Sequence, residues 1–210
     1  MTSEKIATLL RPFGLVDLGL CPTQDSDGLN AETIVLVGPD EPRFWPIFTQ
    51  SAEYADGHPN PLDRWSRSVL TDVAGQLDGA AVFPSDGPPF LPFQSWALRT
   101  GRFWASPIGF LVHETGGLFA SFRGALTLPF TMPQTTGAKP CDTCVDHPCA
   151  SACPVSAFAD GYDVAACKTH LNSPQGTDCM TEGCRARRAC PVGQGNRLPA
   201  QAAFHMEAFL

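Results

Sequence analysis

The first part of the chain shows both helical and extended hydrophobic patterns. Apolar residues recur every four positions from Trp65 to Leu77, which predicts a helix over residues 61–77 with one apolar face. The β-branched run at residues 33–37 (TIVLV) predicts a buried strand. We also expect helices over residues 3–11 and 42–54, strands over residues 80–83, 108–112 and 118–128, and a hairpin turn at Gly116-Gly117. Helices mixed with hairpin-connected strands predict an α+β fold.

Cysteine is distributed very unevenly. Eight of the nine cysteines fall between Cys141 and Cys190, and only Cys21 stands apart, which we interpret as a buried, inert thiol. No hydrophobic period runs through the cysteine-rich part, so we expect irregular and helical segments around a metal core. The chain therefore divides into an α+β domain (1–126), a linker rich in Pro, Thr and Gly (127–140), a cysteine module (141–198) and a short docking helix (199–210).

The balance of charge is acidic. The chain has 14 Lys and Arg residues against 21 Asp and Glu residues, a formal net charge of −7. Such a surface repels phosphates, which argues against a nucleic-acid partner, and it suits docking on the basic patch of a redox partner protein. No apolar run reaches the ~18 residues of a membrane helix, and the first residues lack the apolar core of a signal peptide. We therefore expect a cytoplasmic protein, where dense cysteines hold metal more often than they form disulfides.

The eight clustered cysteines form two runs that end alike. The first is Cys141-x2-Cys144-x4-Cys149-x3-Cys153, the second is Cys167 followed by Cys179-x4-Cys184-x5-Cys190, and each closes in the tetrapeptide Ala-Cys-Pro-Val. In two-cluster ferredoxin patterns, the cysteine before proline ligates the other cluster. We therefore expect two 4Fe–4S clusters, one held by Cys141, Cys144, Cys149 and Cys190, the other by Cys153, Cys167, Cys179 and Cys184.

Several alternatives stay open at this point. The usual x2 spacing between the second and third ligands is x4 here, and the second run has no C-x2-C pair. Two Cys₄ zinc sites are therefore an alternative, although zinc usually uses paired C-x2-C knuckles. Disulfides are a third possibility, and one of the two clusters could be of the 3Fe–4S type.

The cysteine module resembles the two-cluster ferredoxin module of epoxyqueuosine reductase and reductive dehalogenases, in which the same order of cysteines occurs. The segments at residues 60–67 (NPLDRWSR) and 111–125 (LVHETGGLFASFRGA) resemble the cobalamin-processing family that includes the cytosolic decyanase. The resemblance implies a nitroreductase-like α+β domain that holds a corrinoid, joined to a module that reduces it. In those relatives the two parts follow one another in the same order as here.

Five side chains of the first domain are candidates for binding the corrinoid. Asp63, Arg64 and Arg67 flank Trp65 on the helix expected at 61–77 and could contact a polyamide ligand at a pocket rim. Asp63 is equally explained by the favourable interaction of a carboxylate with a helix N-terminus. His113 and Arg123 lie on the expected hairpin, where a histidine is as often hydrogen-bonded to the hairpin itself. No catalytic proton donor can be assigned.

Together these features favour an iron–sulfur redox protein that delivers low-potential electrons through two 4Fe–4S clusters to cobalamin bound by residues 1–126. Whether such a protein is an enzyme, for example a cobalamin-processing reductase, stays open. One alternative is a plain ferredoxin-type electron-transfer protein without corrinoid. Another is a zinc-stabilised binding module. Arg185, Arg187 and Arg188, beside Cys184, could raise a cluster potential or dock an acidic partner, although such a run of charges is more often simply a solvated face.

Overall fold

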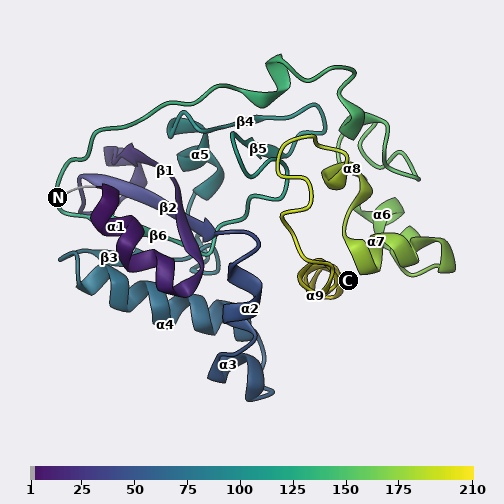
Figure 1. Cartoon of the computed structure of the whole chain (residues 1–210). Helices are drawn as coiled ribbons and strands as arrows, with labels where there is room; N and C mark the ends of the chain where they lie inside the picture. Colours follow the sequence, from purple (N-terminus) through teal and green to yellow (C-terminus); the bar gives the residue numbers. More distant parts are fainter. Residues whose placement is uncertain (1–2) are drawn as a thin grey trace. The chain divides into compact units, whose positions relative to one another are not determined.

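The computed structural model describes residues 3–210, which separate into two compact units (Figure 1). Unit 1 comprises the chain up to Arg102 together with Ser121–Gly137, and unit 2 comprises Phe103–Ala120 and Ala138–Leu210. Helices and antiparallel strands both occur, so the expected α+β class is correct. Among the helices of residues 3–210, none combines the length and the apolar character that crossing a bilayer requires.

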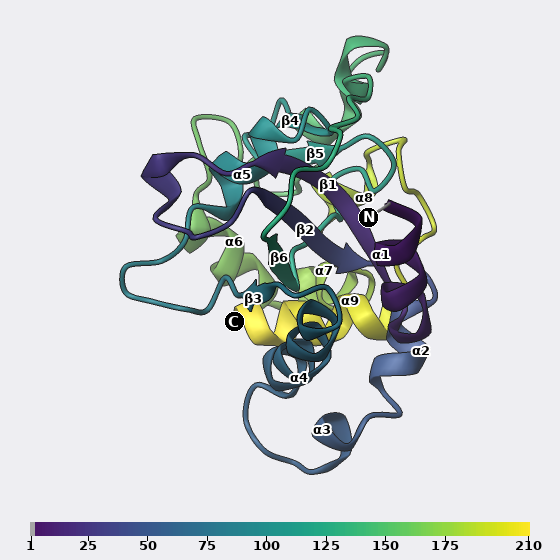
Figure 2. The same ribbon diagram turned by 90° about the vertical axis from the view of Figure 1, so that its left-hand side faces the viewer.

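Unit 1 is built on a four-stranded antiparallel sheet in the order β1-β2-β6-β3 (Figure 2). Every residue of the central strand β2 is buried, because its TIVLV run is apolar on both faces. The neighbouring strand β6 is likewise buried throughout. The strands are β1 (Leu15–Pro22), β2 (Thr33–Pro39), β3 (Ala80–Val82) and β6 (Gly124–Leu128).

Five helices surround this sheet: α1 (Ser3–Leu10), α2 (Phe44–Phe48), α3 (Ala52–Ala55), α4 (Pro61–Gly75) and α5 (Phe93–Arg99). Helix α4 packs on β6 and β3. Its buried face includes Trp65, Val69 and Val73, as the four-residue spacing predicts. Pro61 occupies the first position of the helix, where its missing N–H costs nothing. Helices α1 and α5 both pack against β1.

The helix expected over residues 42–54 is wrong, because the chain forms α2 and α3 with a break between them. The side chains of Thr49 and Gln50 donate to backbone carbonyls of α2, at 3.0 and 2.7 Å, and so satisfy the helix end. Ser51 then caps α3 by accepting the N–H of Tyr54 at 3.2 Å.

The hairpin expected between residues 108–112 and 118–128 is also wrong. The turn at Gly116-Gly117 closes only on His113, which exchanges two 3.0 Å backbone hydrogen bonds with Gly117. Strand β5 (Leu111–His113) pairs instead with β4 (Phe103–Ala105), and β6 pairs with β2 and β3. Strand β1 was not predicted, since a bulge between Asp17 and Gly19 interrupts its alternation.

The compact units differ from the predicted domain ranges. The β4–β5 hairpin belongs to unit 2, although the sequence pattern assigned it to the first domain. The predicted linker at 127–140 is partly held on unit 1: the Gln134 side chain donates to the Arg99 carbonyl at 2.6 Å, and Gly137 N–H donates to the Gly101 carbonyl at 2.9 Å. Burial of apolar residues, which local composition does not reveal, decides these boundaries.

Unit 2 contains the cysteine-rich segment and the β4–β5 hairpin. Its helices are α6 (Val164–Leu171), α7 (Thr177–Glu182), α8 (Arg185–Arg188) and α9 (Pro199–Phe209). The docking helix expected over 199–210 is α9, which packs against α7. Cysteines contribute to the core of unit 2, where Cys149 and Cys190 are buried together with Ile108, Val112 and Leu118.

A largely buried ion pair joins the short 3-10 turn at Asp25–Asp27 to the end of helix α5. Asp27 accepts hydrogen bonds from the Arg99 guanidinium at 2.6 Å, the Trp96 indole at 2.9 Å and the Gln24 backbone at 2.8 Å. Burial alone would raise the pKa of Asp27, but the Arg99 and Gln24 hydrogen bonds, with that of Trp96, hold it below the usual range. Arg99 also lies 3.7 Å from the sulfur of Cys21, which is buried as expected.

We predict that Asp27→Asn lowers the free energy of unfolding by about 1–3 kcal/mol at neutral pH, since charged hydrogen bonds are lost. The depressed pKa stabilises the fold above the unfolded-state value of about 3.9, and this contribution disappears as pH falls through the folded-state value. Urea unfolding between pH 7 and pH 3 should therefore show a weaker acid dependence in the variant. Asp25→Asn, on the exposed neighbouring aspartate, is the control; an equal effect of both substitutions contradicts the assignment.

Candidate metal centre

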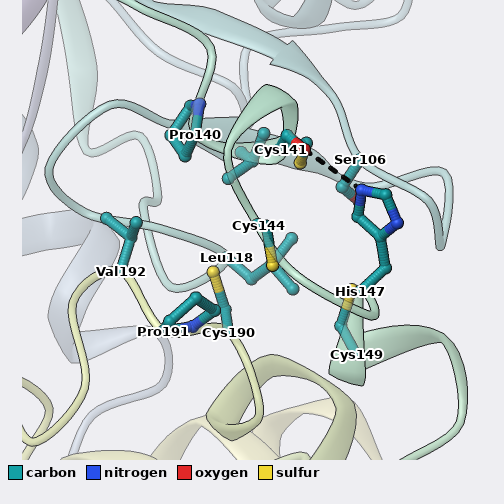
Figure 3. A pocket seen from close by; sticks show the side chains of 11 residues that line it. Ser106, Leu118, Pro140, Cys141, Cys144, His147, Cys149, Cys190, Pro191 and Val192 are labelled. Atoms are coloured by element: carbon teal, nitrogen blue, oxygen red, sulfur yellow. Dashed lines mark hydrogen bonds between the residues drawn. The ribbon is translucent and has the colours of Figure 1, made fainter.

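Four cysteines from distant parts of the chain line one cavity of unit 2. They are Cys141, Cys144, Cys149 and Cys190, the set predicted for the first cluster, and Figure 3 shows them around the same space. The cavity encloses about 300 Å³ of space between protein atoms, part of it open to solvent. Apolar side chains complete its wall, among them Val112, Leu118 and Val192. Forty residues separate the third of these cysteines from the fourth, so the fold alone brings Cys190 to the others.

The loop from Cys141 to Cys149 folds back on itself. Asp146 and His147 both adopt left-handed backbone, with φ of 61° and 40°. The His147 imidazole meets the Cys141 carbonyl at 3.1 Å between Nε2 and O, as the dashed line in Figure 3 marks. This reversal returns Cys149 to the beginning of the loop. Four residues separate Cys144 from Cys149, where two are usual, and Asp146 and His147 form the turn within this longer spacing.

The turn after β5 holds Cys190 in place. Gly117 has φ of +56°, and a Cβ atom there would overlap the Val192 carbonyl oxygen and lie 3.3 Å from the Cys190 sulfur. Gly193 has φ of +73° and also lies close to the Gly116 carbonyl, since its Cβ would lie 2.9 Å from that oxygen. Only glycine permits this backbone conformation and this proximity together. The hairpin of unit 2 therefore positions the fourth cysteine.

Electrostatic coupling confirms that these four sulfurs are neighbours. Burial raises the pKa of the Cys149 thiol, and Cys190, Cys141 and Cys144 raise it further, because a second negative charge nearby is unfavourable. Burial likewise raises the pKa of Cys141; Lys139 opposes this effect, while Cys190 and Cys144 add to it. Neutral thiols are therefore favoured over thiolates at this place.

In the second predicted set, backbone amides act on three sulfurs. Cys153 accepts the Ala157 N–H at 3.3 Å. The amides of Arg187 and Ala186 lower the pKa of Cys184, the cap residue of α8, and the amide of Arg185 lowers that of Cys179. Burial still raises the pKa of both Cys179 and Cys184, against the effect of these amides. Amide groups directed at sulfur are a common environment of iron–sulfur ligands.

The members of this second set are linked to one another through Cys184. Its pKa is raised by Cys167, and the pKa of Cys179 is raised by Cys184 in turn. Cys153 packs against the same core cluster as Cys184. Burial raises the pKa of Tyr162, and the neighbouring Cys167 raises it further. Cys167 and Cys179 therefore both lie within electrostatic range of Cys184.

All nine cysteines are free thiols. Across residues 3–210, no three His, Cys, Asp or Glu side chains are arranged closely enough to hold a single metal ion. A cubane carries its four irons on separate corners, so its thiolates stand farther apart than the ligands of one ion.

Two of the five predicted corrinoid-binding residues share a cavity in unit 1. Asp63 and Arg123 lie 3.8 Å apart and line a cavity of about 500 Å³. Its remaining wall consists of Phe83, Pro84, Ser85 and Phe122. Gly124 keeps Phe83 in position, since a Cβ there would lie 3.1 Å from the ring.

The other three candidates are engaged elsewhere. Arg64 binds the Asp56 carboxylate at 2.7 Å and the Glu53 carbonyl at 2.9 Å. Arg67 pairs with Asp86 and lies 4.2 Å above the Phe83 ring. His113 belongs to unit 2, is 1% exposed, and its Nδ1 accepts the Gly116 N–H at 3.1 Å. His113 therefore hydrogen-bonds its own turn, which was the alternative to corrinoid binding for this histidine.

The three arginines beside Cys184 all contact other side chains. Arg185 and Arg188 both bind the Asp178 carboxylate, and Arg187 lies 4.9 Å above the Phe110 ring. Sequence reasoning missed Gly117 as a packing contact. The Gly116-Gly117 pair did signal a turn, but nothing in the sequence showed that the turn packs on Cys190.

We predict that Gly117→Ala displaces the Cys190 segment and exposes its thiol, because the new methyl group overlaps Val192. Alkylation of Cys190 in the metal-free protein, followed by mass spectrometry, should be at least ~10-fold faster, which corresponds to ~1.4 kcal/mol of local stability. Gly109→Ala is the matched control, since Gly109 has φ of +77° and nothing within 4 Å of its Cβ position. Equal rates for both variants would contradict the packing role.

No protein-family model and no curated protein matches this chain.

Proposed function

We propose that the chain is an electron-transfer protein with two 4Fe–4S clusters in a ferredoxin-like module. One cluster would bind Cys141, Cys144, Cys149 and Cys190, and the other Cys153, Cys167, Cys179 and Cys184. The observation that carries the proposal is the gathering of Cys190 with the three cysteines of the first run around one cavity. This interleaving is the arrangement expected of a two-cluster module.

The residues fit such a group in three respects. Thiolates are the ligands that iron–sulfur clusters use. The cavity wall is mainly apolar, which limits access of water to a cluster. Backbone amides directed at Cys153, Cys179 and Cys184 would stabilise the negative charge of thiolates bound to iron. A bound cluster supplies one-electron transfer; the chain supplies the ligands, the hydrogen bonds and the exclusion of water.

Zinc is the weaker alternative for the same cysteines. A Cys₄ zinc site draws four sulfurs to about 2.3 Å from one ion. Zinc usually uses paired C-x2-C knuckles, whereas Cys141 and Cys144 form the single C-x2-C pair of the chain. Two zinc sites would also not explain why Cys190 of the second run gathers with three cysteines of the first run.

We predict that anaerobic reconstitution with iron and sulfide yields about eight irons and eight sulfides per chain. Cys141→Ser with Cys190→Ser removes two ligands of one cluster, so about four irons and one intact 4Fe–4S cluster should remain. Cys141→Ser with Cys153→Ser removes one ligand from each cluster and should leave no intact 4Fe–4S cluster. Electron paramagnetic resonance of the reduced proteins, with iron and sulfide analysis, measures both.

Cys21→Ser is the control, because Cys21 belongs to unit 1 and should change neither count. The opposite result would be an intact cluster in Cys141→Ser/Cys153→Ser and none in Cys141→Ser/Cys190→Ser. It would show that each run of four cysteines holds its own cluster, without exchange of Cys153 and Cys190. Protein that binds about two zincs and takes up no sulfide would refute the proposal.

A corrinoid as the electron acceptor is a second proposal, which rests on the resemblance and on the cavity shared by Asp63 and Arg123. The part of that cavity that water can enter is about 220 Å³, so it would take only an edge of a corrinoid. We predict that the visible bands of cobalamin shift on mixing with the protein and that Arg123→Ala weakens this shift. Arg43→Ala, on an exposed arginine of unit 1, should leave the shift unchanged. If the wild-type chain does not shift the cobalamin bands, the corrinoid proposal is wrong and electron transfer without a corrinoid is the remaining function.

A further inference from the structure

A serine hydroxyl without a partner lies in the wall of the cysteine cavity. Ser106 lines this cavity together with the four cysteines, and Figure 3 shows it among the side chains around that space. The residue is only 9% exposed, and within residues 3–210 its Oγ has no hydrogen-bond partner. A buried hydroxyl without a partner costs free energy, so most such groups in folded proteins are hydrogen-bonded. The position of Ser106 therefore favours a group inside the cavity that accepts a hydrogen bond.

Backbone hydrogen bonds hold Ser106 at this place. It follows strand β4 directly, and its N–H donates to the Phe110 carbonyl at 2.9 Å. Its own carbonyl accepts the Gly109 N–H at 3.0 Å, within the turn that joins β4 to β5. Both backbone groups of Ser106 are thus satisfied by the turn itself. The side-chain hydroxyl is the group that remains for a ligand of the cavity.

The rest of the wall offers this hydroxyl little. Besides Ser106 and the cysteines, His147 is the lining residue with a polar side chain in the described part of the chain, and its Nε2 already meets the Cys141 carbonyl. Val112 and Leu118 are apolar, and the sulfur of a neutral thiol is a weak acceptor. The sulfurs of an iron–sulfur cluster carry negative charge, and ionised acceptors form the stronger hydrogen bonds. Such a group in the cavity would give the hydroxyl its partner.

We propose that the Ser106 hydroxyl donates a hydrogen bond to a sulfur of the cluster in this cavity and thereby raises the reduction potential of that cluster. Reduction adds negative charge to the iron and sulfur atoms, so a donor on sulfur favours the reduced state. The inference rests on the proposed function, since it requires the cluster. It goes further by assigning the adjustment of one of the two clusters to a single side chain of the β4–β5 hairpin.

Two serines provide a matched pair of variants. Ser106→Ala removes the hydroxyl from the cavity wall. Ser121→Ala is the control, because the Ser121 Oγ is also buried and without a hydrogen-bond partner among the described residues, but belongs to unit 1. Both proteins are reconstituted with iron and sulfide and titrated with dithionite under potentiometric control, with the clusters followed by electron paramagnetic resonance. Cys153→Ser/Cys184→Ser removes two ligands of the second cluster and so identifies the signal of the first.

In Ser106→Ala we expect full iron and sulfide content and a lower midpoint potential for the first cluster. At a fixed potential, its oxidised-to-reduced ratio should rise several-fold, up to about 10-fold, which equals about 59 mV for one electron. The second cluster, and both clusters of Ser121→Ala, should keep their midpoints. Unchanged midpoints overturn the inference, as does an equal shift of both clusters. Loss of the first cluster from Ser106→Ala also overturns it, since the hydroxyl would then serve assembly rather than potential.

Urea unfolding of the metal-free proteins separates this role from a purely structural one. Without a cluster the hydroxyl has no partner in the described chain, so its removal should leave the urea midpoint of unfolding unchanged or raise it. A lower urea midpoint for metal-free Ser106→Ala would show that the hydroxyl supports the fold itself, and it would overturn the inference.

The failure of this inference differs from a failure of the proposed function. If wild-type protein takes up about eight irons and eight sulfides while Ser106→Ala behaves as wild type, only the role of Ser106 is wrong. If wild-type protein takes up neither iron nor sulfide, the clusters themselves are wrong, and the inference falls with them.

Discussion

Thiol groups that lie far apart in the sequence have to share one small, mostly apolar space in unit 2, and much of the unit is organised around that requirement. Burial and mutual repulsion both raise the pKa of Cys149, so the group carries negative charge only at a cost in free energy. A cationic iron core would reverse that cost. The surrounding backbone is correspondingly constrained: left-handed residues close the loop at Asp146 and His147, and Gly117 permits the approach of the Cys190 segment.

The two sets of cysteines differ in how their sulfurs are stabilised. Around the cavity, the wall is made largely of apolar side chains such as Val112 and Leu118. In the second set, a backbone amide donates to Cys153, amides lower the pKa of Cys184, and Arg187 lies over the neighbouring Phe110 ring. Hydrogen bonds to sulfur and nearby charge are the main means by which a protein adjusts a cluster. Under the proposed function, the two clusters would therefore have unequal environments.

In unit 1, hydrophobic patterns predicted some elements correctly and missed or mispaired others. The apolar face of α4 and the apolar run of β2 follow directly from the hydrophobic pattern. Helix α4 packs one face on the sheet, and β2 lies inside the sheet with all its residues buried. Strand β1 escaped notice because a bulge at Asp17 and Gly19 breaks its alternation. The predicted hairpin failed since pairing depends on which strand edges are free, and β6 completes the central sheet. Of the five predicted corrinoid-binding residues, the fold brings only Asp63 and Arg123 into one cavity.

The sequence by itself determined the mixed α+β class, the separation of a cysteine-rich segment, and the identity and order of eight candidate ligands, because composition, period and spacing are local properties. Only the tertiary structure decided that Cys190 lies with Cys141 and that the β4–β5 hairpin belongs to unit 2. Those facts depend on contacts between segments distant along the chain. Such contacts are set by burial and by backbone geometry, which no short stretch of residues contains.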